Sequence, residues 1–524
     1  MLKTLLLASV AALVSTAAIA QESLPQESSQ WFTDAQAKIK EVMARQPNTK
    51  RAKNVILLIA DGNGVTTNYA TRLWMGQQEG GMGDDFVQPQ EAFPYLALAK
   101  TYNINAQTPD SAPTAGSMNT GVKQLFNTIN VSDKAVFEDC ASVKGNELET
   151  FAEMVSKDGK SVGVLTTARL THATPAAVYA KTAARDWEDA VPEGCTAQKD
   201  IAAQLVDQMK AGVIDLAMGG GRRHFIDKSI TLSEEENTKG KRTDGKNLID
   251  EAKAAGAEYA WNTETFKNLK LDGKTPVLGL FEDSHMKYEA DRTDEDEPSL
   301  ADMTKAAIEY LSKNDKGYYL EIEGGRVDHA NHDGNAYRAV TDGAAFSAAV
   351  AMADEMTDDE DTLIIVTADH EHSIALNGYC GRGSPILGLC YEVNTATGEG
   401  NMKHADTPNL GADNKPYTVI GYLNGAGSVL KEQSDKSYSG SRPDLTDEEA
   451  QDKEYLQQAL VPMSSETHSG VDVAIYAKGP WSHLFDGTVE QNYIFHVMNQ
   501  AVHGDGMDAA ENGGAMEATP ASAN

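Results

Sequence analysis

The stretch 323–332 reads Glu-Gly-Gly-Arg-Val-Asp-His-Ala-Asn-His and directly follows the run Gly-Tyr-Tyr-Leu-Glu-Ile at 317–322. This largely apolar run predicts a buried strand, so the polar residues begin at its carboxyl end, where open α/β sheets bind ligands. Asp328 and His332 are four residues apart and share one face if a helical turn begins here. With Glu323 they predict a metal site, because Asp and His suit zinc and Glu suits a harder ion. A solvated polar loop is the alternative interpretation.

A second cluster of the same kind favours the metal interpretation. The apolar run 363–366 also predicts a strand, and Asp369, His370 and His372 follow it. Two strands that end in Asp and His would place these ligands at the same edge of a sheet.

Two weaker signals have the same form. The apolar run 55–60 ends in Asp61 and Gly62, although Asp-Gly alone is also a common turn. His468 lies just before the predicted strand 471–477, although a lone histidine is more often structural.

Other residues suit phosphate chemistry. Ser111 precedes small residues that could start a helix, which would expose backbone N–H groups beside its hydroxyl. An N-cap is the alternative, since a nucleophilic serine needs a metal ion or a base. Thr174 offers a neutral oxygen ligand, and Arg185 offers a fork for two phosphate oxygens. The residues of interest after the predicted strand 162–167 are Arg169, His172, Thr174 and Arg185.

Strands and helices alternate along most of the chain, which predicts an α/β fold: a mostly parallel central sheet flanked by helices on both faces. Length alone would also allow several domains. We expect one domain over 21–503, with an inserted lobe at about 373–442 and a disordered tail at 504–524. The further predicted strands are 214–218 and 277–281, and the predicted helices are 31–46, 201–211, 300–312 and 337–355.

The charge balance excludes some partners. The chain has 45 Lys and Arg against 78 Asp and Glu, a net charge of −33, so we expect no nucleic-acid or anionic-membrane binding. An anion site in such a chain must be made locally positive by metals or a few arginines.

The first 20 residues predict export. Lys3, an apolar core at 5–14 and Ala18-Ile19-Ala20 have the order of a secretory signal peptide, and no later run is long enough to span a membrane. An exported protein can hold disulfides, and four cysteines allow three pairings. Because two of them are close in sequence, we favour Cys380 with Cys390 and Cys140 with Cys195; free buried thiols are the alternative.

The motifs together resemble the alkaline phosphatases over about residues 50 to 500, and most closely the animal-type members, despite a bacterial-style signal peptide. The resemblance is carried by Ala60-Asp61-Gly62, Asp110-Ser111-Ala112, His172-Ala173-Thr174-Pro175 with Arg185, the stretch 323–329 with His332, Thr367-Ala368-Asp369-His370 and Glu466-Thr467-His468.

The resemblance implies a phosphomonoesterase with two zinc ions and one magnesium ion. Ser111 would form a phosphoserine that is then hydrolysed, and Arg185 would bind two phosphate oxygens. The implied ligands are Asp328, His332 and His468 for the first zinc, Asp61, Asp369 and His370 for the second, and Asp61, Thr174 and Glu323 for magnesium.

The chain has His172 and His329 on the phosphate side, where some bacterial relatives carry Asp and Lys, and this leaves zinc or magnesium open for the third site. Animal-type members also have a structural calcium site, which Phe281, Glu282 and Glu297, with one of the three glutamates 234–236, could partly match. The resemblance further implies that 373–442 is a crown lobe, and that the N-terminal helix embraces a second subunit in a homodimer. From the signal peptide we expect this homodimer to be periplasmic or secreted.

Two other functions fit part of the pattern. A sulfatase or phosphodiesterase could use a similar metal-bearing scaffold, but no cysteine lies in the Cys-x-Pro-x-Arg motif of sulfatases. An exported metal-binding or phosphate-binding protein would need the ligands but not Ser111.

Overall fold

The computed structural model describes residues 24–233, 235, 237–396 and 402–504, so the predicted signal peptide and nearly all of the predicted tail lie outside the described residues. The chain divides into two units, of which the first ends at Pro47. Within the described part of this first unit, a short 3-10 helix (Pro25–Ser28) precedes helix α1 (Gln30–Ala44), and no residue of α1 is buried.

A ten-stranded sheet forms the centre of the second unit. Strand β18 runs antiparallel to both of its neighbours, and every other neighbouring pair is parallel, which confirms the predicted mostly parallel sheet. The strand order is β19 (Thr488–Glu490), β2 (Tyr95–Lys100), β18 (Val473–Lys478), β10 (Thr362–Thr367), β1 (Asn54–Ala60), β9 (Tyr318–Gly324), β3 (Ser161–Arg169), β4 (Leu216–Gly220), β8 (Val277–Leu280) and β7 (Glu258–Ala260).

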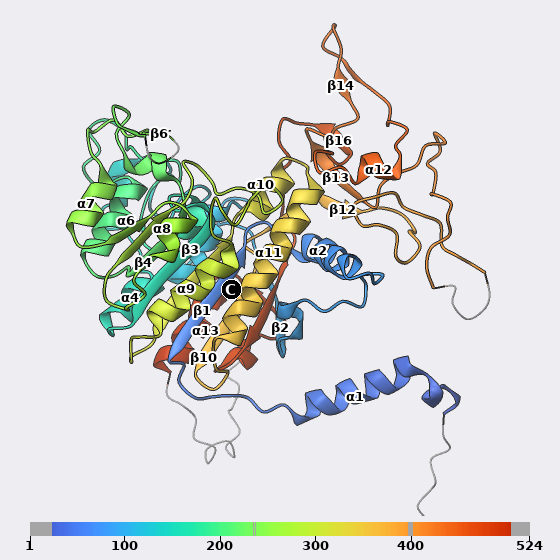
Figure 1. The fold of residues 1–524 in the computed structure, drawn as a ribbon, viewed down its shortest axis with the longest axis horizontal. Helices are drawn as coiled ribbons and strands as arrows, with labels where there is room; N and C mark the ends of the chain where they lie inside the picture. Colours follow the sequence, from blue (N-terminus) through green and yellow to red (C-terminus); the bar gives the residue numbers. More distant parts are fainter. Residues whose placement is uncertain (1–23, 234, 236, 397–401, 505–524) are drawn as a thin grey trace, which may run out of the picture. The chain divides into compact units, whose positions relative to one another are not determined.

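Helices cover both faces of this sheet (Figure 1). Successive side chains of the central strand β1 enter different cores: Leu57 and Ile59 pack on one face, and Ile56 and Leu58 on the other. This explains why central strands read as continuous apolar runs. The first core contains α3 (Ser111–Thr120), α4 (Phe151–Lys157), α6 (Ile201–Lys210), α7 (Leu248–Ala254) and α13 (Tyr493–His503), and the second contains α9 (Leu300–Leu311) and α11 (Ala336–Glu355).

A lobe with its own small core follows β10. Helix α2 (Val65–Gln78) contributes Ala70 and Leu73 to this core and lies beside the lobe in Figure 1. The last strand of the lobe sheet lies beyond the predicted range 373–442. The lobe contains a three-stranded sheet, β12 (Ile374–Leu376), β13 (Ile420–Gly425) and β16 (Ala459–Pro462), a hairpin of β14 (Lys431–Glu432) and β15 (Tyr438–Ser439), and α12 (Asp447–Ala450).

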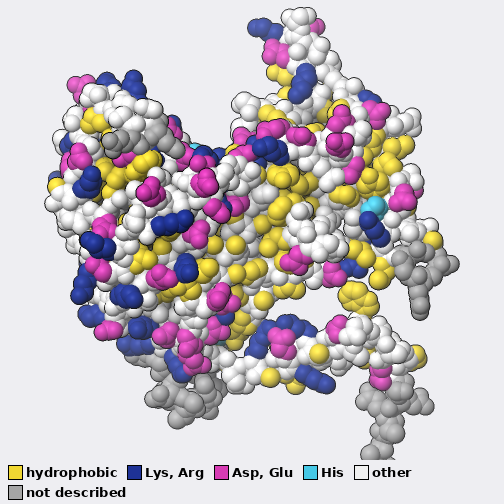
Figure 2. Space-filling view, viewed as in Figure 1, with side chains coloured by type: hydrophobic (Ala, Val, Ile, Leu, Met, Phe, Trp, Pro, Cys, Tyr) yellow, Lys and Arg dark blue, Asp and Glu magenta, His cyan; other side chains and the backbone are white. Residues whose placement is uncertain are grey.

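The surface mixes charges of both signs. On the face drawn in Figure 2, Lys and Arg side chains are interspersed with Asp and Glu. Among the described residues, we find no helix with the length and apolar character needed to cross a bilayer.

Candidate active site and metal centre

The predicted ligands meet at the carboxyl ends of neighbouring parallel strands. Asp61 directly follows β1, and Asp369 comes two residues after β10. Glu323 lies near the end of β9, in register with Ile59 of β1 and Thr166 of β3. Strand register therefore brings together residues that are hundreds of positions apart in sequence.

The imidazoles of His332 and His468 face each other beside Asp328. Asp328 and His332 both lie on the short helix α10 (Arg326–His332). Nδ1 of His332 lies 2.6 Å from the carbonyl oxygen of Glu466, and Nδ1 of His468 lies 2.8 Å from that of Pro109. Because a carbonyl only accepts, both Nδ1 atoms carry the proton and both Nε2 atoms present lone pairs.

These Nε2 atoms are 3.0 Å apart, and each lies 3.4 Å from Oδ1 of Asp328. Lone pairs at this distance repel unless a cation lies between them. Hydrogen bonds from the outer ring nitrogens also orient the imidazoles in the way seen in metal sites. Asp328, His332 and His468 therefore fit a zinc ion.

Asp61, Asp369 and His370 form a second group, completely buried. Nε2 of His370 lies 3.2 Å from Asp61 Oδ1 and 3.4 Å from Asp369 Oδ2. Burial raises the pKa of both carboxyl groups to about 7, and the negative charge of Asp328 adds to the shift for Asp61 as that of Asp61 does for Asp369. A divalent cation here would restore the ionised form of both.

The third group consists of oxygen atoms without hydrogen-bond partners. Within the described part of the chain, Asp61 Oδ2, Thr174 Oγ1 on helix α5 (Ala173–Ala176) and Glu323 Oε1 are buried and unpaired. Burial, together with the charge of Asp61, raises the pKa of Glu323 well above its ordinary value. Unpaired buried oxygens are costly, and each of these is a ligand type that suits a hard cation. His172 offers an alternative ligand beside Asp61 and Glu323.

Ser111 is the first residue of α3 and is 2 % exposed. Its Oγ lies 3.1 Å from Nε2 of His370 and 3.3 Å from Oδ1 of Asp61. Asp110 is the N-cap, since its carboxylate accepts from the amide of Ala112 at 3.2 Å. The capping role considered for Ser111 thus belongs to its neighbour, and the hydroxyl of Ser111 faces the ligand cluster.

Arg185 contacts two residues next to the ligand cluster, Asp110 and His172. Its guanidinium forms an ion pair with Asp110 and contacts Nε2 of His172 at 3.0 Å. Burial alone would lower the pKa of Arg185, but the carboxylates of Asp110 and Asp61 raise it above its ordinary value. The ion pair therefore holds the guanidinium against Asp110, the residue that precedes Ser111.

Arg169 is the other arginine near His172 that could bind phosphate, but its guanidinium is bound to Glu188. Its Nε and Nη2 donate to the two carboxylate oxygens of Glu188 at 2.8 and 2.7 Å, and its Nη1 contacts His285. A fork bound to a carboxylate has no free bidentate face for phosphate.

Two histidines of the site lie outside the predicted ligand sets: His372 belongs to the predicted cluster after 363–366 but was assigned to no ion, and His285 was not predicted. Nε2 of His372 lies 3.0 Å from Asp328 Oδ1, and its Nδ1 lies 2.6 Å from Glu466 Oε2, so it joins the first ligand group. The ring of His285 lies 4.0 Å from that of His329. His285 follows β8 by five residues, so the rule that ligands gather at carboxyl ends of parallel strands could have found it.

The histidines on the phosphate side are neutral. Burial lowers the pKa of His329 to about 3 and that of His172 well below its ordinary value. Their rings lie 5.3 Å apart. They therefore contribute hydrogen-bonding nitrogens to this side of the cluster and no positive charge.

Comparison with known proteins decides the family. The sequence model described as "Alkaline phosphatase" matches residues 52–503. The chain belongs to the alkaline phosphatase family. It is therefore a metal-dependent phosphomonoesterase, and the predicted resemblance is confirmed.

Vertebrate alkaline phosphatases are similar over nearly their whole length. The chain is 39% identical to the tissue-nonspecific isozyme of Gallus gallus over 516 residues, which cover 95% of this chain and 94% of that protein. It is also 39% identical to an alkaline phosphatase of Gadus morhua, covering 90% and 96% of the two chains.

Solved bacterial alkaline phosphatases share the fold. The enzyme from Thermus thermophilus matches with a TM-score of 0.59 and 20% identity, over 88% of this chain and 94% of that one. The enzyme from the Antarctic bacterium TAB5 matches with a TM-score of 0.57 and 20% identity, over 87% and 100%.

The cysteines of this alkaline phosphatase form the predicted pairs. Cys140 is bonded to Cys195, and Cys380 is bonded to Cys390. All four cysteines of the chain are thereby used. None can serve as the nucleophile that a sulfatase would need.

The predicted calcium ligands are partly engaged in other contacts. The carbonyl oxygen of Phe281 accepts from Arg222 at 2.9 Å, and Glu297 accepts the amide of Lys287 at 2.8 Å through Oε1. Burial and the charge of Glu282 raise the pKa of Glu297 to about 8. Of the three candidate glutamates 234–236, the first and last lie outside the described residues.

Proposed function

We propose that the protein hydrolyses phosphate monoesters to an alcohol and inorganic phosphate through a phosphoserine at Ser111, using two zinc ions and one magnesium ion. The observation that carries the proposal is the position of the Ser111 hydroxyl. It is buried within 3.3 Å of Asp61 and His370, two ligands of the second predicted zinc.

The chain's own residues support a two-step transfer. The Oγ of Ser111 forms a bond to phosphorus while the ester P–O bond breaks and the alcohol leaves with a proton. A water oxygen then bonds to phosphorus while the bond to Ser111 breaks, which releases inorganic phosphate and returns a proton to the hydroxyl. Bound metal ions would supply nucleophile activation and neutralisation of phosphate charge. The amino terminus of α3 and the guanidinium of Arg185 would bind the remaining phosphate oxygens.

For the third ion we favour magnesium. Its donors Asp61, Thr174 and Glu323 are all oxygens, which Mg²⁺ prefers. A variant of the TAB5 enzyme, whose fold is similar at a TM-score of 0.55, has Mg bound in its M3 site. Zinc in place of magnesium, on elemental analysis of protein purified with both ions present, would count against this assignment and favour His172 as a ligand.

Calcium is a further proposed ion, held by Glu282 and Glu297 with the carbonyl of Phe281. Glu297 Oε2 is buried and has no hydrogen-bond partner within the described residues. Calcium binding should therefore raise the melting temperature of the wild type. A Glu297→Gln variant should lose this response, and an equal response in both would remove Glu297 from the site.

We also propose a homodimer. Helix α1 has no buried residue, and its Trp31 and Met43 are each 79% exposed. In the lobe, Leu423 and Leu460 are 63% and 60% exposed, and Figure 2 shows hydrophobic side chains at the surface of this lobe. Large exposed apolar side chains of this kind mark interaction surfaces. Light scattering should give twice the chain mass, and a Trp31→Glu/Met43→Glu variant should weaken the dimer.

Export to the periplasm or beyond is the proposed localisation. Two disulfides suit an oxidising compartment, as does the predicted signal peptide. Sequencing of the amino terminus of the exported protein should begin near Gln21, whereas an intact leader on a cytoplasmic protein would contradict export.

The phosphoserine is tested by replacing Ser111. Ser111→Ala should lower kcat by at least about three orders of magnitude with metal content unchanged. Ser117→Ala is the matched control, because Ser117 lies on the same helix, is also 2 % exposed and only donates to the carbonyl of Thr114 at 2.8 Å. Acid quench during turnover should leave phosphate on the peptide that contains Ser111. Phosphate on another peptide would refute the assignment.

A further inference from the structure

Arg185 lies on backbone that belongs to no helix or strand. A guanidinium that must reach both Asp110 and a bound phosphate needs a fixed backbone, and here no sheet ladder provides it. The contacts that hold the segment 177–185 therefore decide where the guanidinium lies.

The loop that follows the nucleophile helix α3 provides one set of contacts. The amide of Arg185 donates to the carbonyl of Asn127 at 2.9 Å. Ile129 and Thr182 exchange two backbone hydrogen bonds, at 3.0 and 2.9 Å. The loop after α3 is thus hydrogen-bonded to the segment that carries Arg185.

Asn130 adds a side-chain contact to this path. It is completely buried, and its Nδ2 donates to two carbonyl oxygens, of Ala177 at 2.7 Å and of Ala180 at 2.8 Å. The backbone N–H of Asn130 donates to Oε1 of Gln124 at 2.6 Å. Nε2 of Gln124 in turn donates to Oγ1 of Thr120, the last residue of α3, at 3.1 Å. Asn130 therefore connects the end of α3, through its backbone N–H, to the backbone that leads to Arg185, through its side chain.

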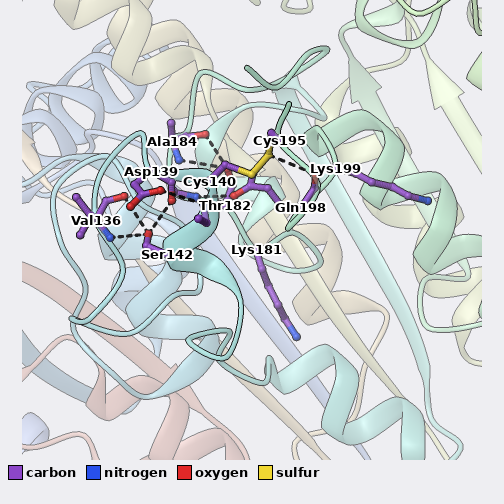
Figure 3. The surroundings of a disulfide bond; sticks show 12 residues. Val136, Asp139, Cys140, Ser142, Lys181, Thr182, Ala184, Cys195, Gln198 and Lys199 are labelled. Atoms are coloured by element: carbon purple, nitrogen blue, oxygen red, sulfur yellow. Dashed lines mark hydrogen bonds between the residues drawn. A yellow bond between two sulfur atoms is a disulfide. The ribbon is translucent and has the colours of Figure 1, made fainter. Parts of the chain in front are cut away.

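The side-chain amide of Gln198 binds the same backbone segment at residues nearer to Arg185. Oε1 of Gln198 accepts from the amide of Ala183 at 3.1 Å, and its Nε2 donates to Thr182 Oγ1 at 2.7 Å. Figure 3 shows Gln198 and Thr182 beside the disulfide of Cys195, three residues before Gln198.

We propose that the side-chain amides of Asn130 and Gln198 are positioning residues for Arg185. They fix the backbone of 177–184, so that the guanidinium is already aimed at the phosphate position when substrate enters. Within the described residues, neither side-chain amide forms a hydrogen bond with a predicted metal ligand, so their loss should leave the ions in place. The inference rests on the proposed role of Arg185 as the phosphate clamp.

A double-mutant cycle in the metal-loaded enzyme tests this proposal. Asn130→Gly removes the side chain with its amide and does not strain the backbone, because φ at Asn130 is 52° and glycine adopts this left-handed conformation freely. We expect at least about a tenfold loss of kcat/KM on an aryl phosphate monoester, and a similar weakening of inhibition by inorganic phosphate, since about a tenfold loss matches one buried hydrogen bond and the Asn130 side chain donates two. In an Arg185→Ser background, the same substitution should change kcat/KM less than about twofold.

Matched variants separate positioning from general instability. Asn414→Gly, at an exposed lobe residue with a φ of 57°, should leave activity unchanged. Gln198→Ala should repeat the pattern of Asn130→Gly, and it carries the test if Asn130→Gly does not fold. Zinc content should equal that of the wild type in both positioning variants.

The outcomes are distinguishable. Equal losses in both backgrounds, or no loss in either, would overturn the positioning role. An Arg185→Ser variant with normal monoester hydrolysis and phosphate inhibition would overturn the clamp in the proposed function, and the positioning role with it. A loss confined to the background that keeps Arg185 supports both.

Discussion

The metal cluster and the arginine segment lie side by side but are held in different ways. Asp61, Glu323 and Asp369 lie at or just beyond the ends of parallel strands whose ladders fix their spacing. Arg185 lies on irregular backbone that is held by turn residues, two side-chain amides and a nearby disulfide. One half of the site therefore depends on the sheet, and the other half on a few local contacts.

This difference should allow metal binding and phosphate binding to be damaged separately. Damage to the sheet edge should change metal content and the chemical step. Damage to the loop contacts should change phosphate affinity and leave the ions in place.

Loss of a cluster ligand should have the largest effect. His468→Ala removes one of the two Nε2 atoms that face each other at 3.0 Å, so zinc content should fall by one ion per chain and kcat by roughly two orders of magnitude or more. Elemental analysis and steady-state kinetics measure both. His503→Ala, at an exposed position on α13, is the control, and an unchanged zinc count in His468→Ala would remove His468 from the site.

Loss of the clamp should have the next largest effect, with ions retained. Arg185→Ser should lower kcat/KM for a monoester about a hundredfold, because two charge-assisted hydrogen bonds are lost. A matched diester has one oxygen fewer to clamp and should lose much less. Arg169→Ser should cost less on the monoester, since its fork binds Glu188. A larger monoester loss for Arg169→Ser, or equal losses on both substrates for Arg185→Ser, would show that the clamp is misassigned.

Removal of either disulfide should have the smallest effect on activity, and the two removals should differ in their effect on KM. Cys140–Cys195 spans 55 residues, so a Cys140→Ser/Cys195→Ser variant should lose about 4 kcal/mol of unfolding free energy and raise KM several-fold with normal zinc content. Cys380–Cys390 spans 10 residues within the lobe, so its removal should cost about 3 kcal/mol and leave KM unchanged. Denaturant titration and kinetics measure both. Equal KM shifts in the two variants would contradict the local role of the first disulfide.

The same difference explains what could be predicted from sequence. The strands that end at Asp61, Glu323 and Asp369 were readable as apolar runs, because a strand buried on both faces has no polar alternation. The helical turn that pairs Asp328 with His332 followed from their spacing.

The supports of Arg185 could not be predicted in this way. Asn127 and Asn130 read as ordinary turn residues, and their partners lie about 50 residues away along the chain. Nothing in the local pattern shows which distant carbonyl a buried amide will meet. Arg185 itself was found by its fork chemistry and by resemblance to the family, and the contacts of Gln198 became visible only in the structure.

Metal content is the most direct test of the central claim, that the clustered carboxylates and imidazoles hold the ions that activate Ser111. Elemental analysis of protein purified with zinc and magnesium present should give two zinc ions and one magnesium ion per chain. Chelation should remove the ions and the activity together, and addition of both metals should restore both. Full activity in protein with less than one zinc ion per chain would contradict the account.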